Sequence, residues 1–134
     1  MSASAGKIAE IAASPSDNLR CFRMLIRQAL VADDKAAAKE AAADWQYAGY
    51  RMTIFSSDEE KYAEDIVLEG AKVPFYPTTA LELAGARVET GEFFKPKVVQ
   101  DRELITSQNS PSAHAIADLF VKALDRYSAA KAAA

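Results

Sequence analysis

The sequence has almost none of the residues that bind structural metals or form disulfides. Its 134 residues include one cysteine, Cys21, and one histidine, His114. A single cysteine cannot form an internal disulfide, and one Cys with one His leaves no ligand set for structural zinc. We therefore expect no metal and no cofactor. The cysteine usage fits a reducing intracellular compartment, either the cytoplasm or an organelle matrix such as that of the mitochondrion.

Long apolar runs and an excess of basic charge are absent as well. No apolar stretch approaches the roughly 20 residues that a membrane-spanning helix needs, and the opening MSASAGKIAEIAAS lacks the apolar region of a secretory signal. Sixteen Lys and Arg against nineteen Asp and Glu give a net charge of −3, with no basic stripe. The composition therefore predicts a protein that does not span a membrane and does not bind nucleic acid.

Half of the residues in the chain are hydrophobic, which is enough to form one domain with a modest core. Residues 1–15 are small and polar and are predicted to be a flexible arm. Residues 16–48 are predicted to be helical, because apolar residues from Leu19 to Leu30 recur at helical spacing opposite three arginines. Those arginines would also suit an uncleaved organellar presequence.

The following residues alternate between strand and helix signals. The run at 51–55 (RMTIF) is typical of a short strand, and Ser57 with Glu60 is predicted to cap a helix that reaches about residue 68. Two prolines predict an extended segment at 73–77. Thr79 with Glu82 is then predicted to cap a short helix that ends at Gly85.

The last third of the chain predicts a hairpin followed by a helix. Strands are expected at 86–90 and 97–100, and the turn at 101–103 leads into a strand at 104–106, so that VVQDRELIT forms a hairpin. After a polar loop, apolar residues mark one face of a final helix. These are Ala113, Ile116, Ala117, Phe120, Val121 and Leu124. The tail at 128–134 is predicted to fray.

Three blocks within residues 49–124 resemble the ThiJ/PfpI superfamily, whose members have the class I glutamine amidotransferase-like fold. The resemblance is greatest to the glyoxalase-III and chaperone-like branch of that superfamily. The blocks are GYRMTIFSSDEE (49–60), KVPFYPTTALELAGARVE (72–89) and KVVQDRELITSQNSPSAHAIADLFVKAL (97–124). The resemblance implies an α/β fold in which 49–127 is the family's carboxy-terminal region. We expect a truncated sandwich, that is, a partial sheet with flanking helices and a helical amino-terminal extension.

The resemblance also implies which catalytic part is missing. The family's nucleophile is a cysteine on a sharp strand-to-helix elbow, within a Cys-His-Gly run ahead of the matched region. This chain has no such run, and ALVADDK (29–35) falls roughly where the strand and elbow belong, with Asp33 and Asp34 near the Cys-His pair. Cys21 lies in a predicted helix without an elbow glycine and is interpreted as structural, although neighbouring arginines would lower a thiol pKa.

Other polar groups have simpler interpretations than catalysis. His114 and Asp118 are predicted to lie on the solvent face of the last helix. The acids at 58–60 are expected to stabilise the amino terminus of their helix through its dipole. The polar run at 107–110 is interpreted as a structural turn before the last helix. We therefore predict no catalytic residue.

An aromatic cluster precedes the first strand and is either core or an interface anchor. The candidate partner interface consists of this cluster and two strand residues, namely Trp45, Tyr47, Tyr50, Met52 and Ile54. A parallel-type strand at 51–55 is normally paired at both edges, and most of the sheet is missing from this chain.

Three functions follow from these features. The first is a non-catalytic accessory or structural subunit that binds other protein subunits at an open sheet edge. The alternative is one half of a split glyoxalase- or deglycase-type enzyme whose Cys elbow is supplied by another chain. An independent small-molecule binding module is the least favoured, because no predicted cleft gathers convergent polar groups.

Overall fold

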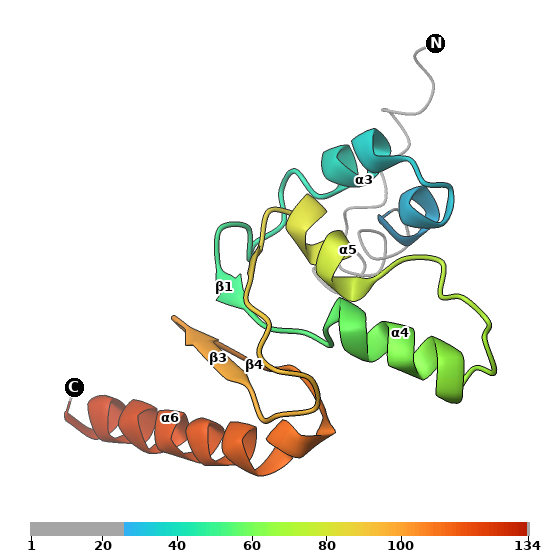
Figure 1. Ribbon diagram of the computed structural model, residues 1–134. Coiled ribbons are helices and arrows are strands. Elements are labelled where there is room, and N and C mark those ends of the chain that lie inside the picture. The colour runs from blue at the N-terminus through green and yellow to red at the C-terminus, as the bar shows by residue number, and fades with distance from the viewer. Residues whose placement is uncertain (1–25, 134) are drawn as a thin grey trace. The chain divides into compact units, whose positions relative to one another are not determined.

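The computed structural model describes residues 26–133, and the chain divides into two compact units, Met1–Gln46 and Tyr47–Ala134 (Figure 1). The predicted arm at 1–15, the first part of the predicted helix and Cys21 lie outside the described residues. The division falls two residues before the expected start of the family-like region at residue 49.

The described part of the first unit contains two short helices joined by a turn, and its residues from 42 onward form turns, so the helix predicted over 16–48 does not continue past residue 41. Residues 26–31 are helical, and α3 (Lys35–Ala41) follows after Asp33, whose φ of 53° is left-handed. Asp34 caps α3, because its carboxylate accepts a hydrogen bond from the N–H of Ala37 at 3.0 Å. The segment 29–35 therefore contains no strand, and its match to the family's strand and elbow is wrong.

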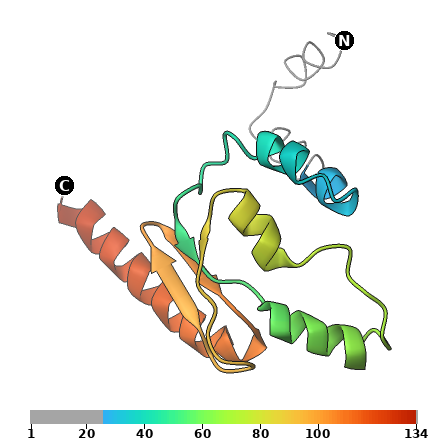
Figure 2. The same cartoon turned by 45° about the horizontal axis from the view of Figure 1, so that its top comes forward.

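The second unit is a mixture of helices and two small sheets, which confirms the α/β class at that level (Figures 1 and 2). One sheet pairs β1 with β2 in parallel, and the other pairs β3 with β4 antiparallel. In chain order the elements are β1 (Arg51–Met52), α4 (Ser57–Ile66), α5 (Pro77–Leu83), β2 (Arg87–Val88), β3 (Val98–Asp101), β4 (Leu104–Ser107), η1 (Ser110–Ser112) and α6 (Ala113–Ala133).

Strand β1 is covered at both edges, so the predicted open edge at 51–55 is wrong. On one side it pairs with β2, with Arg51 opposite Arg87. On the other side its N–H groups bond to side chains of the hairpin: Arg51 N–H donates to the Asp101 carboxylate at 2.8 Å, and Thr53 N–H donates to Thr106 Oγ1 at 2.9 Å. The hairpin thus replaces a neighbouring strand without joining the ladder.

The unpaired edge belongs to β2 instead. On the side toward β1, the N–H of Arg87 and the N–H of Glu89, the residue that follows β2, donate to the carbonyls of Tyr50 and Met52, each at 2.8 Å. Because hydrogen-bonding groups alternate along a strand, the N–H of Val88 faces the opposite edge. Within residues 26–133 no further strand pairs with β2 there.

Helix α4 begins one residue earlier than its sequence suggested. The cap is Ser56 rather than Ser57, and a capping box joins Ser56 to Glu59 rather than Ser57 to Glu60. The run Ser-Ser-Asp-Glu-Glu contains both spacings, so local sequence does not choose between them. Tertiary hydrogen bonds that Glu59 accepts from Phe94, Gln108 and Asn109 decide the register.

Helix α5 also begins differently from the prediction. Pro77 occupies its first turn and Tyr76 is its cap, without a side-chain hydrogen bond. The predicted cap of Thr79 and Glu82 is therefore wrong, and Pro77 belongs to the helix rather than to the extended segment. Proline fits this position because the first helical N–H has no partner within the helix.

Gly85 ends α5 as predicted, and its replacement by alanine is expected to destabilise the fold. Gly85 has a φ of +94°, and a Cβ there would lie 3.3 Å from Ala48 Cβ. Gly70, at φ +87°, has nothing within 4 Å and is the matched control. We expect urea unfolding to show a loss of about 1 kcal/mol for Gly70→Ala and a larger one for Gly85→Ala. Equal losses would mean that the contact with Ala48 contributes nothing.

The predicted hairpin and final helix are confirmed, but α6 is longer and more exposed than expected. Asp101 pairs with Leu104 across the turn, and α6 packs against β4. The helix continues to Ala133, so the predicted frayed tail is wrong; alanine and lysine favour helix there. None of its residues, all of which lie in the described range, is buried.

Candidate functional site

A buried carboxylate, that of Glu59 in the first turn of α4, organises the second unit. Its side chain is fully inaccessible to solvent. Glu59 Oε2 accepts from Ser56 N–H and Ser56 Oγ at 2.9 Å and from Gln108 Nε2 at 3.0 Å. Its Oε1 accepts from Phe94 N–H at 2.9 Å and from Asn109 Nδ2 at 2.7 Å. Five donors therefore converge on one carboxylate.

This hydrogen bonding keeps Glu59 ionised. Burial raises the pKa of the carboxyl, but the hydrogen bonds from Asn109, Ser56 and Phe94 favour its charged form. The net result is that the pKa of Glu59 lies below its ordinary value. With all its acceptors engaged by the protein, Glu59 acts as a structural anion rather than as an exposed acid or base.

The same network fixes the loop at 91–97. Gly91 N–H donates to Gln108 Oε1 at 2.7 Å, and Asn109 Nδ2 donates to the carbonyl of Lys95 at 2.8 Å. Ser112 Oγ accepts from Lys97 N–H at 3.0 Å. With Phe94 N–H held by Glu59, the loop is anchored at both ends and in the middle. The polar run at 107–110 is thus a structural turn, as expected, whose side chains reach other elements.

The fixed loop presents aromatic side chains to solvent beside α4. Phe93 and Phe94 contact each other edge to face with centroids 4.7 Å apart, and Tyr62 of α4 contacts them at 5.5 and 5.7 Å. We call Tyr62, Phe93 and Phe94 the aromatic patch. Its three side chains are 39–48% exposed, which is high for residues of this size.

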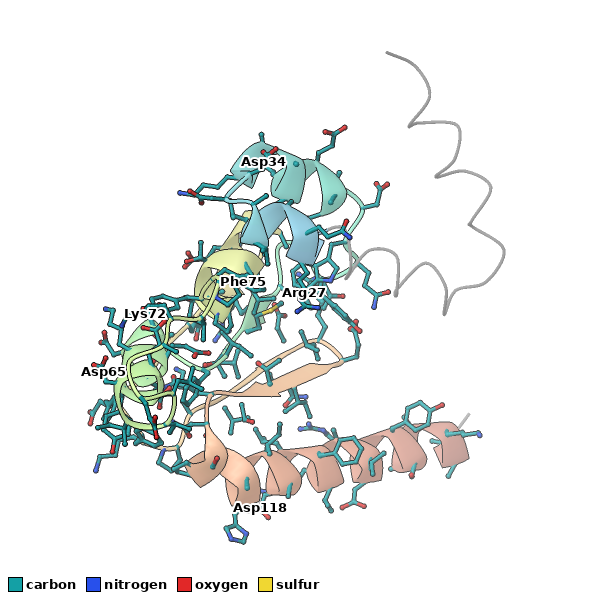
Figure 3. The ribbon with its side chains drawn as sticks, turned by 90° about the vertical axis from the view of Figure 1, so that its right-hand side faces the viewer. Arg27, Asp34, Asp65, Lys72, Phe75 and Asp118 are labelled. Atoms are coloured by element: carbon teal, nitrogen blue, oxygen red, sulfur yellow. The ribbon has the colours of Figure 1, made fainter. Side chains whose placement is uncertain are left out.

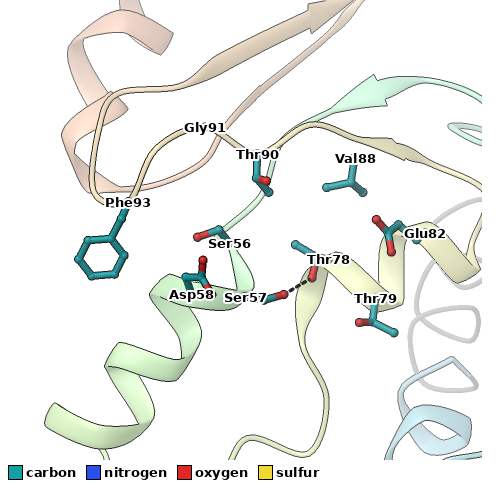
Figure 4. A pocket seen from close by; sticks show the side chains of 10 residues that line it. All are labelled: Ser56, Ser57, Asp58, Thr78, Thr79, Glu82, Val88, Thr90, Gly91 and Phe93. Carbon is teal, nitrogen blue, oxygen red and sulfur yellow. Dashed lines mark hydrogen bonds between the residues drawn. The ribbon is translucent and has the colours of Figure 1, made fainter.

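A pocket of about 300 Å³ adjoins the patch and shares Phe93 with it (Figure 4). It lies past the carboxyl ends of β1 and β2, where ligands bind in many α/β proteins. Hydroxyl groups and two carboxylates line it, and Ser57 Oγ and Thr78 Oγ1 are hydrogen-bonded at 2.8 Å. The lining residues are Ser56, Ser57, Asp58, Thr78, Thr79, Glu82, Val88, Thr90, Gly91 and Phe93.

The pocket contradicts the prediction from sequence that no cleft gathers convergent polar groups. Polar groups do converge on a cleft, although the sequence predicted none, because the lining comes from segments up to 37 positions apart (56 to 93). The acids at 58–60 also separate in the fold. Asp58 is exposed at the pocket, Glu59 is buried, and Glu60 is half-buried.

A second buried carboxylate, Glu64, holds the segment after α4. It accepts from Lys72 Nζ and Val73 N–H at 2.9 Å and from the Tyr76 hydroxyl at 3.2 Å. The Lys72 ammonium lowers the pKa of Glu64, against the opposing effect of burial. Figure 3 shows Lys72 beside Asp65 at this end of α4, and their charged atoms are 3.6 Å apart.

The five predicted interface residues fall in both units and differ in exposure. Trp45 belongs to the first unit and Tyr47 to the second; both are half-buried. Tyr47 and Tyr50 stack edge to face at 5.4 Å, and the guanidinium of Arg102 lies 3.9 Å above the Tyr50 ring. Met52 is only 3% exposed, so it is core.

Ile54 is half-buried. The interface role of the five residues stays a prediction.

His114 and Asp118 are both exposed, as predicted. Figure 3 shows Asp118 on the side of α6 that faces away from the hairpin. Within residues 26–133, no group of three or more His, Cys, Asp or Glu side chains is placed to hold a metal ion. In the same range no helix is both long and apolar enough to cross a membrane.

The chain matches no family model, no curated protein and no solved structure. Its resemblance to the ThiJ/PfpI superfamily therefore stays a prediction from the sequence.

Proposed function

We propose that the chain is a non-catalytic accessory or structural subunit, built on a truncated ThiJ/PfpI-like scaffold, that binds other protein subunits. The observation that carries this proposal is an uncovered apolar face on α6. Its members are 47–68% exposed and recur at helical spacing. They are Phe120, Val121, Leu124 and Tyr127, and we call them the α6 face. Contiguous exposed apolar surface of this kind marks interaction sites.

The α6 face adjoins the side of the helix that already has a neighbour, because Phe120 and Tyr127 lie about 40° and 20° around the helix from Ile116, at 100° per residue. Ile116, Leu119 and Ala123 are half-buried where α6 packs against β4. The apolar arc of α6 is thus wider than the hairpin covers. A helix or groove of another protein would bury the remainder, in the way that amphipathic helices are commonly recognised.

Two features of the second unit support the same conclusion. Its buried apolar residues, within the described range, are Met52, Ala84 and Val99, a small core for a unit of this length. Strand β2 also has one edge with which no strand within residues 26–133 pairs. A partner protein would compensate for both features, because it would bury further apolar area or add a strand to the edge of β2.

The proposed lack of catalysis rests on the sequence. The family's chemistry requires a cysteine thiolate at a sharp turn, and Cys21 is followed by Phe22 rather than by His-Gly. No other cysteine is present.

The alternative, half of a split glyoxalase- or deglycase-type enzyme, is favoured by one observation, the pocket past the ends of β1 and β2. A second chain carrying the Cys elbow would have to complete it. Once such a partner is identified, the purified pair should act on methylglyoxal or its adducts without a cofactor. An inactive pair would exclude this alternative while leaving the accessory role intact.

The accessory role is tested with a photo-crosslinking amino acid placed on α6 in the source cells. At Leu124 we expect an adduct of one defined mass above the 14.5 kDa chain. The control position is Lys122, which is exposed and lies about 160° around the helix from Leu124, at 100° per residue. No adduct should form there. A chain that migrates as a monomer in cell extract and gives no adduct at Leu124 would refute the proposal.

A further inference from the structure

We propose that the aromatic patch and the adjoining pocket form a second docking surface, which recognises a segment of another protein carrying Lys or Arg beside an apolar residue. The patch would contact the apolar side chain, and the pocket would receive the cation. Phe93 belongs to both. This inference rests on the proposed accessory role and adds a second docking surface, which is formed by elements other than α6.

The backbone that carries the aromatic patch is held rigidly in place. Phe94 has a φ of +49°, a left-handed conformation that is unfavourable for a bulky residue. The N–H of Phe94 is held by the fully buried carboxylate of Glu59 at 2.9 Å, and its ring contacts Phe55 at 6.2 Å. Strain of this kind persists only where the surroundings impose it, and it concentrates at binding sites.

A rigid aromatic surface is also a favourable binding surface. Aromatic side chains supply large contact areas and are enriched at interfaces. Because the loop at 91–97 is anchored by Gln108, Asn109 and Ser112, binding would order little that is not already ordered. Pre-organisation of this kind increases affinity by lowering the entropic cost of association.

The charge of the pocket is complementary to a cationic side chain. Its lining contains two carboxylates, Asp58 and Glu82, and no basic side chain. Asp58 forms an ion pair with Lys61 at 3.2 Å, but both groups are largely exposed, so the pair is weak. Glu82 forms no ion pair with any residue in 26–133. A cation would thus gain carboxylates, the hydroxyls of the lining and the ring of Phe93.

The spacing of the partner's residues follows from chain geometry. In an extended segment, residues i and i+2 lie on the same face, roughly 6.6 Å apart. A basic residue and an apolar residue at that separation would reach the pocket and the neighbouring patch together. The partner's motif is therefore expected to place the two residues two positions apart.

The test is selection of random heptapeptides displayed on phage against the full-length chain. Peptides that bind the wild type should share a Lys or Arg two positions from an apolar residue. Phe93→Ser should weaken their binding at least tenfold in fluorescence anisotropy, and Glu82→Gln at least threefold at low salt. Phe120→Ser, on the α6 face, should leave binding unchanged. A urea midpoint close to that of the wild type verifies that each variant is folded.

Any one of the following results would overturn this inference. It fails if no peptide class is selected on the wild type that is lost on Phe93→Ser. It fails equally if the selected peptides lack a basic residue, or bind Glu82→Gln as tightly as the wild type. Peptides lost on Phe120→Ser and kept on Phe93→Ser would place recognition on the α6 face, refuting this inference while supporting the accessory role.

Discussion

Replacing Glu59 with alanine is expected to lower the free energy of unfolding by more than about 3 kcal/mol, the largest effect of any single change considered for this chain. The substitution removes the acceptor of five hydrogen bonds from a site that is fully buried. Each donor left unsatisfied in a buried site costs about 1–3 kcal/mol, although water entering the vacated space would recover part of that. Urea unfolding followed by circular dichroism measures the loss.

Two other variants separate the buried carboxylate from its place in the helix. Glu59→Gln keeps the shape but turns an NH₂ group toward donors, and we expect a loss of about 2 kcal/mol. Asp58→Ala removes an acid from the same helical turn at an exposed position, and its effect should stay within about 0.5–1 kcal/mol. If Glu59→Ala destabilises no more than Asp58→Ala, the network contributes nothing to stability.

The second large effect is a loss of stability in acid that depends on Glu59. The pKa of Glu59 is lowered in the folded chain, so the folded state binds its proton less readily than the unfolded state. Its contribution is fully present above the unfolded value of about 4.3 and is lost as the pH falls through the lower, folded value. Glu64, whose pKa is also lowered, adds to the same trend.

Glu60 titrates in the opposite sense and supplies a control. Burial, and then the charge of Glu64, raise the pKa of Glu60, so its ionisation disfavours folding and its protonation relieves this. Urea midpoints measured between pH 7 and pH 3 should fall less steeply for Glu59→Gln than for the wild type. For Glu60→Gln they should fall more steeply. Identical slopes for Glu59→Gln and the wild type would contradict the assignment of a low pKa to Glu59.

If both stability predictions hold, they link the buried network to the proposed docking surface. Glu59 holds Phe94 N–H, and Phe94 carries one ring of the aromatic patch. Loosening the network would therefore disturb the patch without touching an exposed residue. The buried polar network of this unit therefore supports the loop at 91–97.

Local sequence was sufficient wherever neighbouring residues decide the structure. The hairpin followed from two β-rich runs around a short turn, and the last helix from apolar residues at three- and four-residue spacing. Gly85 ended α5 as expected, because a left-handed position after a helix favours glycine. The α/β class followed from the same alternation of signals.

Local sequence failed where distant residues decide. Nothing near Glu59 distinguishes it from Glu60, and the donors that bury it, Gln108 and Asn109, lie 49 and 50 positions away. The cap of α4 was misplaced by one residue for the same reason. Likewise, the edge of β1 is covered by Asp101 and Thr106, side chains that the strand's own sequence cannot reveal.

The sequence by itself thus determined the order of helices and strands in the second unit, although not all of their ends, as well as the lack of a cysteine elbow and a net charge of −3. Only the tertiary structure decided which carboxylates are buried, which strand edge is unpaired and which apolar residues stay exposed on α6. The physical reason is that periodicity and turn chemistry act over a few residues. Burial and hydrogen-bond satisfaction depend on which distant segments meet.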